Sequence, residues 1–290
     1  MRFDFIRQHK KAYPITLMCK VMEVGRSGYY KYLKRYKENK ISPDFELIAK
    51  VKEIHSDSDG TYGSRRTSMQ LREDGHDVGR YRARNLMKKA KVSVKRRKKF
   101  KKTTDSNHNL PVAPNLLERN FEVQRPNTVW CADITYLWTI QGWLYLAVII
   151  DLYSRKIVGW AMSNRLKTSL VEQALSMAYW HRKPGKGLIH HSDRGSQYAG
   201  KEYQKLLNRY GMVCSMSRKG DCWDNAVAES FFHTLKTERT NGNLYRIRNE
   251  ARNDVIDYIE MFYNSRRLHS FIGYKSPNDF EKKVVLPLAA

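Results

Sequence analysis

The sequence predicts an α/β protein in which a helical N-terminal region precedes a mixed five-stranded sheet with flanking helices. Three observations support this fold class. Apolar residues at helical spacing and Gly-containing turns fill the first hundred residues, and a segment rich in Val, Ile, Leu, Thr, Tyr and Trp follows Arg125-Pro126. From residue 169 onward, helical and strand-like segments alternate. Consecutive strands followed by such alternation give one mixed sheet with helices packed on its faces.

The charge of the chain indicates a polyanionic partner. The formal net charge is +25, and the first hundred residues carry 27 Lys and Arg against 11 Asp and Glu. Such residues release condensed counterions when they neutralise phosphates, so we expect nucleic acid, with an anionic membrane surface as the rival. No apolar stretch approaches the roughly 18 residues of a spanning helix, and the basic N-terminus lacks the apolar part of a signal peptide. We therefore expect a cytoplasmic protein with no membrane partner.

The cysteines argue against a zinc site or a disulfide framework. They lie far apart and form no CxxC pair, so we expect reduced thiols. These residues are Cys19, Cys131, Cys214 and Cys222.

The N-terminal region is expected to contain two helical parts. Residues 1–40 predict a helix, a tight turn at residues 25–28 and a second helix. Residues 41–100 predict a three-helix unit. Its helices are expected at residues 45–55, 64–74 and 79–90. Three short helices with a Gly-containing turn fit a helix-turn-helix DNA-binding domain, and a bundle used for packing or dimerisation fits the pattern equally well. The basic charge favours DNA.

A strongly basic tail closes this unit. Ten of the fifteen residues from 88 to 102 are Lys or Arg. We expect this run to contact DNA phosphates, the alternative being a solvated charge run without a partner. The expected contact residues are Arg96, Arg97, Lys98 and Lys99. The polar, Pro-containing stretch that follows predicts a linker over residues 101–122.

Residues 123–285 are expected to form the sheet domain. Three consecutive strands are predicted at residues 128–138, 143–151 and 156–162, the first two joined by a hairpin. A helix, a strand, a helix and a strand then follow at residues 169–181, 187–191, 200–210 and 212–215. Two last helices are predicted at about residues 224–240 and 249–263.

Three carboxylates stand where this sheet would present them to one edge. Asp133 lies in the first strand, Asp193 directly follows the fourth, and Glu229 lies on a helix with 35 residues between it and Asp193. Carboxylates suit Mg²⁺ or Mn²⁺, and converging ones can hold a metal pair about 4 Å apart for in-line phosphoryl displacement. Taken singly, each acid is more commonly a surface, turn or helix-face residue. Lys236 follows Glu229 by two helical turns, so it is expected on the same face, as a phosphate contact or as part of a solvated charged face.

These residues lie in motifs that resemble a known enzyme family. The triad, Lys236, HSDRGSQY and GDCWDNAVAESFFHTLKTE resemble the retroviral-integrase-like DDE transposases, and within them the second-reading-frame (OrfB) products of the bacterial insertion-sequence-three family. The segments VMEVGRSGYY and YGSRRTSMQLREDGHDVGRYRARNLM are similar to that family's helix-turn-helix-like region, and YNSRRLHSFIGYKSPNDF is similar to its C-terminal signature. The resemblance covers almost the whole chain and implies a ribonuclease-H-like core.

The resemblance also implies a polynucleotidyl transferase. Asp133, Asp193 and Glu229 would bind two divalent metal ions, normally Mg²⁺. Water would first free a 3′-hydroxyl at an element end, and that hydroxyl would attack another phosphodiester without a covalent protein intermediate. The implied partners are double-stranded DNA of the transposon ends and target, further copies of the chain, and an upstream-frame helix-turn-helix protein in a fusion or complex. The His-His-Cys-Cys zinc module of retroviral integrases has no counterpart in this sequence.

Several further residues are weaker candidates. Arg194 beside the second Asp, and Asn225 one helical turn before Glu229, are expected DNA contacts, whereas Asp224 is expected to cap the helix. The two histidines before Asp193 are read as the end of a strand. Three tryptophans are expected in the packed interior rather than as base-stacking platforms, because they lie in apolar strands. They are Trp130, Trp138 and Trp143.

Two other functions share parts of this pattern. A ribonuclease H or junction nuclease has the same core and metals but does not join strands, and the helical N-terminus argues against it. A DNA-binding regulator that descends from an inactive transposase would keep the basic N-terminus, and the complete triad argues against it.

Overall fold

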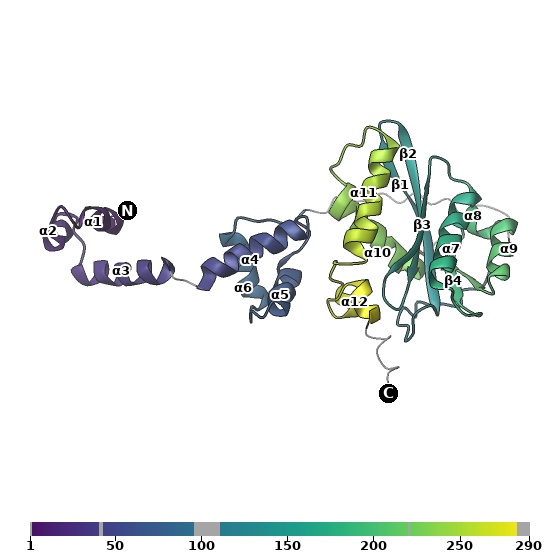
Figure 1. Ribbon diagram of the computed structural model, residues 1–290, viewed down its shortest axis with the longest axis horizontal. Helices are drawn as coiled ribbons and strands as arrows, with labels where there is room; N and C mark the ends of the chain where they lie inside the picture. Colours follow the sequence, from purple (N-terminus) through teal and green to yellow (C-terminus); the bar gives the residue numbers. More distant parts are fainter. Residues whose placement is uncertain (1, 41–42, 96–110, 220, 283–290) are drawn as a thin grey trace. The chain divides into compact units, whose positions relative to one another are not determined.

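A computed structural model describes residues 2–40, 43–95, 111–219 and 221–282 (Figure 1). The chain divides into two compact units, residues 1–93 and 94–290, and each is considered by itself. None of the helices in the described ranges is both long and apolar enough to cross a membrane. The thiols of Cys19, Cys131 and Cys214 are free.

The first three helices share a small apolar core. They are α1 (Arg2–His9), α2 (Ile15–Val21) and α3 (Arg26–Lys40). Ile6, Met18 and Tyr29 are buried between them. The prediction of a turn at residues 25–28 was wrong, because α3 already begins at Arg26. Gly28 lies inside α3, where a Cβ atom would come within 3.3 Å of the Phe3 ring, so its small size serves helix packing rather than a turn.

The next three helices form the predicted three-helix unit. They are α4 (Pro43–Asp57), α5 (Ser64–Glu73) and α6 (Arg80–Lys89). Val51, Leu71 and Leu86 are buried, one from each helix. Each helix thus turns an apolar side toward the other two, as expected for helices that are apolar along one stripe. The three helices predicted from the sequence are confirmed.

The sheet has five strands, as predicted. They are β1 (Val129–Thr139), β2 (Gly142–Asp151), β3 (Ile157–Ser163), β4 (Ile189–Ser192) and β5 (Val213–Met216). The order across the sheet is β3-β2-β1-β4-β5. The first three strands are antiparallel, while β4 runs parallel to both β1 and β5. The sheet is therefore mixed, and β1 lies at its centre.

Helices cover both faces of the sheet (Figure 1). One face packs against α7 (Thr168–Arg182), α8 (Ser196–Ala199) and α9 (Lys201–Arg209) through a core that includes Ala147 and Leu175. The other face packs against α10 (Ala226–Leu235) and α11 (Arg248–Asp257) through a core that includes Val148 and Phe231. Alternating residues of each strand supply the two cores, as expected for a sheet that is buried on both faces.

The two long C-terminal helices predicted from the sequence are interrupted. A 3₁₀ turn, Cys222–Asn225, precedes α10, and a π turn, Lys236–Thr240, follows it. A second π turn, Tyr258–Tyr263, continues α11. The short 3₁₀ turn Ser270–Ile272 and the helix α12 (Pro277–Lys282) come after it. Single π turns inside helices are uncommon and often occur near functional residues.

A partly buried ionic network anchors α12 to the sheet domain. Arg182 donates to both oxygens of Glu281, at 2.8 and 2.9 Å, and to Asp151 Oδ2 at 3.2 Å. Asp151 is fully buried and ends β2. The sequence did not predict this arrangement, because it joins three segments that are far apart in the chain.

Candidate active site at the carboxyl ends of the parallel strands

The two candidate aspartates lie at the same level of the sheet. Strands β1 and β4 are parallel, and Ala132 is paired with Ser192, so Asp133 and Asp193 each follow a paired residue on neighbouring strands. Backbone amides orient both carboxylates. The N–H of Ile134 donates to Asp133 Oδ1 at 2.7 Å, and the N–H of Gly195 donates to Asp193 Oδ1 at 2.9 Å.

Helix α10 brings the third carboxylate to the same edge. Its N-cap residue Asn225 is buried, and its Nδ2 atom donates to the carbonyl oxygen of Ala132 at 3.1 Å. This bond docks the start of the helix directly beside Asp133. Glu229, one turn further along the helix, is exposed.

The electrostatics show that the three carboxylates act on one another. Burial raises the pKa of Asp133 well above its ordinary value, and the negative charges of Asp193 and Glu229 raise it further. The N–H of Ile134 and the ammonium of Lys236 act in the opposite direction. The fold has therefore concentrated negative charge at this edge of the sheet.

This donor set has the chemistry that a divalent cation requires. Carboxylate oxygens are hard ligands, and a cation would relieve the charge crowding that raises the pKa of Asp133. Within the described ranges, no three His, Cys, Asp or Glu side chains are already gathered as a metal cluster. The residues fit a metal site by charge and ligand type.

Lys236 lies close enough to this acidic group for its charge to act on Asp133. Its Nζ atom is 5.1 Å from the centre of the Tyr136 ring. Burial lowers the pKa of Lys236 to about 8, and the charge of Asp133 partly opposes this shift. Lys236 is also the first residue of a π turn rather than part of α10.

Comparison with known families identifies the two folded parts of the chain. An integrase core domain matches residues 123–222, and a second integrase core model matches residues 229–285. A helix-turn-helix-like domain matches residues 43–100, which include α4, α5 and α6. This match supports the helix-turn-helix interpretation over a simple packing bundle.

Full-length relatives decide the family. The transposase InsF for insertion sequence IS3A of Escherichia coli (strain K12) is 40% identical over 98% of this chain and 99% of that protein. The chain belongs to the IS3 transposase family. An insertion element IS600 31 kDa protein of Shigella sonnei is 46% identical over 92% of this chain and 98% of that protein. The chain is thus a DDE-type transposase with a ribonuclease-H-like integrase core, as the sequence motifs predicted.

Solved integrase structures show a weaker similarity to the transposase. One is a simian T-cell lymphotropic virus intasome in complex with the PP2A regulatory subunit B56 gamma, with 15% identity, a TM-score of 0.46, and coverage of 83% of this chain and 77% of that chain. Another is the HTLV-2 integrase catalytic core domain in complex with magnesium, with 15% identity, a TM-score of 0.39, and coverage of 53% and 96%.

Asp224 does not cap a helix in the transposase. Its buried carboxylate accepts from the Arg218 backbone and guanidinium, at 2.8 to 3.0 Å, and from Arg119 Nε at 2.9 Å. The Arg218 contacts hold the pKa of Asp224 far below its ordinary value. Asp221 accepts from the N–H of Trp223 and caps the 3₁₀ turn instead. The two arginines are stronger partners than a backbone amide, and Arg119 lies 105 residues away, beyond the reach of a local pattern.

The residues around Asp193 are held by the protein itself. Arg194 Nε donates to the carbonyl oxygen of Ser217 at 2.6 Å and so joins the ends of β4 and β5. His190 and His191 are buried in β4, which confirms that they belong to a strand. Tyr203 lies 2.9 Å from His190 Nε2. The basic residues Arg96, Arg97, Lys98 and Lys99 lie outside the described residues.

The buried histidines predict acid sensitivity. Burial lowers the pKa of His190 to about 3 and that of His191 to about 4, from an ordinary value of 6.5. As the pH falls below 6.5, these histidines are protonated in the unfolded chain before they are protonated in the folded one. Their contribution to the free energy of unfolding is therefore complete above pH 6.5 and is lost as the pH falls toward 4. We expect a lower free energy of unfolding in urea at pH 5 than at pH 7. This decrease in the free energy of unfolding should be smaller in His190→Gln. A decrease equal to that of wild type would show that other groups cause it.

The expectation that three tryptophans are interior holds only for Trp130, which is fully buried. Trp138 and Trp143 are 56% and 42% exposed. The reason is the unequal length of the strands. β4 pairs with β1 only at residues 129–132, so the hairpin formed by β1 and β2 extends well past it.

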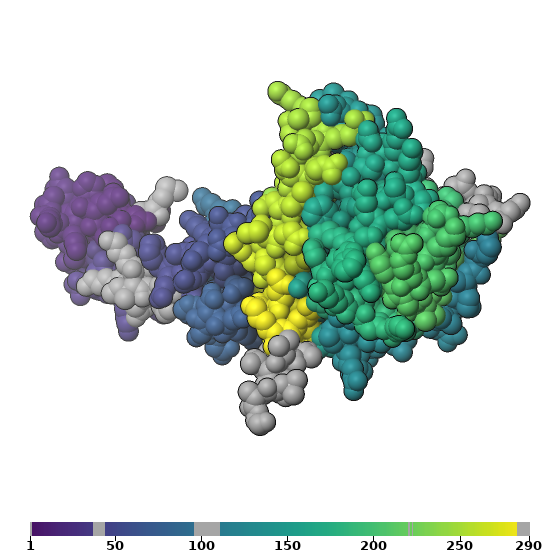
Figure 2. Space-filling view, turned by 45° about the vertical axis from the view of Figure 1, so that its right-hand side comes forward, coloured from purple at the N-terminus to yellow at the C-terminus, as the bar shows by residue number. Residues whose placement is uncertain are grey.

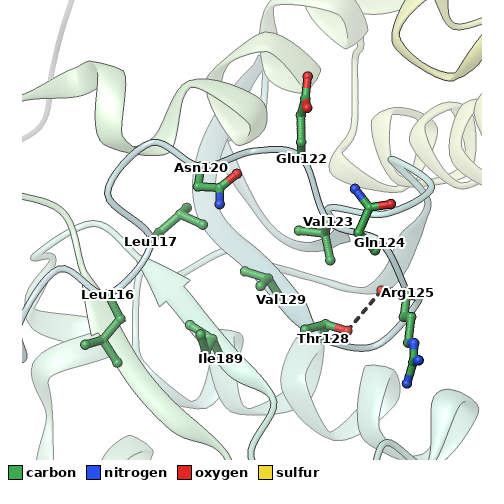
Figure 3. A pocket seen from close by; sticks show the side chains of 10 residues that line it. All are labelled: Leu116, Leu117, Asn120, Glu122, Val123, Gln124, Arg125, Thr128, Val129 and Ile189. Carbon is green, nitrogen blue, oxygen red and sulfur yellow. Dashed lines mark hydrogen bonds between the residues drawn. The ribbon is translucent and has the colours of Figure 1, made fainter.

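A cavity of about 360 Å³ lies away from the candidate active site (Figure 3). It is lined by residues of the segment before β1, among them Leu117 and Val123, and by Val129 and Ile189. Val129 and Ile189 begin β1 and β4, whereas Asp193 follows the opposite end of β4. The cavity therefore does not belong to the carboxylate group. Figure 2 is a space-filling view of one face of the whole molecule, coloured from purple at the N-terminus to yellow at the C-terminus.

Proposed function

We propose that this transposase cleaves DNA at the ends of its insertion sequence and then joins the freed 3′-hydroxyl to another phosphodiester, with Asp133, Asp193 and Glu229 as catalytic, metal-binding residues. The observation that carries this proposal is the gathering of carboxylates at the carboxyl ends of the parallel strands, where burial raises the pKa of Asp133 and the charges of Asp193 and Glu229 raise it further. Phosphoryl transfer needs aligned oxygens and stabilised negative charge more than a protein nucleophile.

The three carboxylates would hold two divalent ions, Mg²⁺ or Mn²⁺, which supply charge stabilisation for the attacking and leaving oxygens. The protein's own part is orientation. The N–H groups of Ile134 and Gly195 fix the rotamers of Asp133 and Asp193, and the Asn225 bond to β1 fixes the helix that carries Glu229.

We further propose how the DNA is held. Lys236, whose charge acts on Asp133, would contact a phosphate near the reacting bond, and Asn225 and Arg194 would be further DNA contacts. Residues 41–100 would bind DNA through the helix-turn-helix-like unit and its basic tail, residues 101–122 would link it to the catalytic core of residues 123–285, and residues 1–40 would form a separate helical segment. Pairing two DNA ends in the cytoplasm would require several copies, alone or with the upstream-frame protein.

The test is a cleavage and joining assay on DNA of the element's own ends. Wild type should give joined products with Mg²⁺ and none with a chelator, and Glu229→Gln should give none while still binding the DNA. Gln keeps the size of Glu but removes its charge. Glu202→Gln on the exposed face of α9 is the matched control and should react like wild type. Equal activity of the Glu229 variant and wild type contradicts the assignment.

Each rival function predicts its own outcome in this assay. A ribonuclease-H-like nuclease would cut without joining strands. An inactive remnant would bind DNA without metal-dependent cleavage, both alone and with the upstream-frame protein.

A further inference from the structure

The tip of the β1–β2 hairpin carries an exposed aromatic row that the catalytic role does not explain. Trp138 and Trp143 face each other across the two strands, and their ring centres are 4.7 Å apart in a T-shaped contact. Tyr136 continues the row, with its ring 4.9 Å from that of Trp143. Large aromatic side chains are normally well buried, so two exposed tryptophans in contact call for a ligand or a partner.

The row lies on one face of the sheet. Trp138 pairs with Trp143 and Tyr136 pairs with Tyr145, and side chains of directly paired residues point to the same side. Elsewhere the same face is covered by α7, α8 and α9, with α7 packed against β3 and β2. The row lies beyond the residues of β1 that pair with β4.

The row begins beside the candidate active site. Tyr136 is three residues after Asp133 on β1, and the Nζ atom of Lys236 is 5.1 Å from its ring centre. The charge of the same Lys236 acts on Asp133. Lys236 therefore lies near both the first ring of the row and the charge of Asp133, although the Asp133 and Tyr136 side chains alternate between opposite faces of β1.

Arg248, the first residue of α11, places a positive charge at the tip of the hairpin and fixes the shape of the tip. Its guanidinium donates to the carbonyl oxygens of Gln141 at 2.7 Å and Trp143 at 3.0 Å. Carbonyl oxygens carry no formal charge, so these contacts order the hairpin without neutralising the cation. Gly142 adopts φ +105°, and a Cβ atom there would lie 2.9 Å from the guanidinium, so only glycine permits this packing.

We propose that Tyr136, Trp138 and Trp143 form a stacking platform for unpaired nucleotides of the DNA next to the reacting phosphodiester. Every base has a π face, so aromatic side chains bind unpaired bases with little regard to sequence, and a nearby guanidinium strengthens such sites. Residues 101–290 carry 27 Lys and Arg (54 − 27) against 18 Asp and Glu (29 − 11), and this basic excess favours a nucleic acid over a protein partner on this surface. The proposal rests on the proposed function, because it concerns the DNA that the same site would process.

The test compares two DNA probes by fluorescence anisotropy, with a chelator present so that nothing is cut. One probe is a duplex of the element's end, and the other is the same duplex with the last nucleotides of one strand unpaired. Wild type should bind the unpaired probe about tenfold or more tightly, since stacking contributes about 1–3 kcal/mol per base. Trp138→Ala and Trp143→Ala should lose this preference but keep their affinity for the paired duplex.

Two controls separate stacking from other causes. Trp138→Phe keeps a π face and should retain most of the preference, and Trp180→Ala, which removes a 64% exposed tryptophan from α7, should change nothing. An unchanged preference in both hairpin variants overturns the proposal. If those variants instead change the sedimentation coefficient and keep the preference, the surface is a contact between copies. Glu229→Gln should retain the preference, so a failure of the catalytic assignment is seen separately.

Discussion

Asp133→Asn is expected to abolish cleavage and joining while raising the melting temperature of the metal-free transposase. The charge of Asp133 is held in a half-buried position against the charges of Asp193 and Glu229, which raise its pKa. An uncharged side chain of the same size removes that repulsion. Activity should fall by at least about a thousandfold, because even the outer partners of metal ligands commonly change activity 10- to 100-fold.

The stability change should have the opposite sign in a matched variant. Asp151→Asn on the neighbouring strand removes a buried carboxylate that accepts from Arg182, and it should lower the melting temperature. Thermal scans with and without Mg²⁺ then test the metal, because added Mg²⁺ should stabilise wild type and not Asp133→Asn. A metal-free Asp133→Asn protein that melts lower than wild type contradicts the charge-crowding argument.

Arg267→Ala is expected to cause the largest loss of stability. Its guanidinium donates to both carboxylate oxygens of Glu238, at 2.7 and 2.8 Å, and both side chains are buried. Tyr258 Oη donates to the same carboxylate at 2.8 Å. Removing one partner of a buried pair leaves an uncompensated charge, which costs about 3–5 kcal/mol. Denaturant unfolding measures this directly.

This ion pair also holds the π turn that contains Lys236. Glu238 lies two residues after Lys236 in that turn, and Arg267 belongs to the C-terminal motif YNSRRLHSFIGYKSPNDF. The double variant Glu238→Leu with Arg267→Met should recover much of the stability, since an apolar pair of similar volume replaces a buried ion pair at little cost. A double variant as unstable as Arg267→Ala would show that the site cannot repack.

The sequence alone determined the strands, most helices and the candidate carboxylates. Enrichment in β-branched and aromatic residues predicts β1, β2 and β3, because such side chains pack well on a pleated sheet. Asp133, Asp193 and Glu229 lie within sequence motifs, so they could be identified without a structure. The family followed from the same motifs and is confirmed by the full-length relatives.

Only the tertiary structure decided which distant segments of the chain contact a given residue. Asp224 binds Arg119 rather than capping a helix, and Trp138 is exposed because β4 is shorter than the hairpin beside it. The π turn at Lys236 is tied through Glu238 to Arg267, which lies 29 residues after Glu238. Local patterns report a residue's own turn or strand face, whereas burial and ion pairing depend on which segments of the chain pack against it.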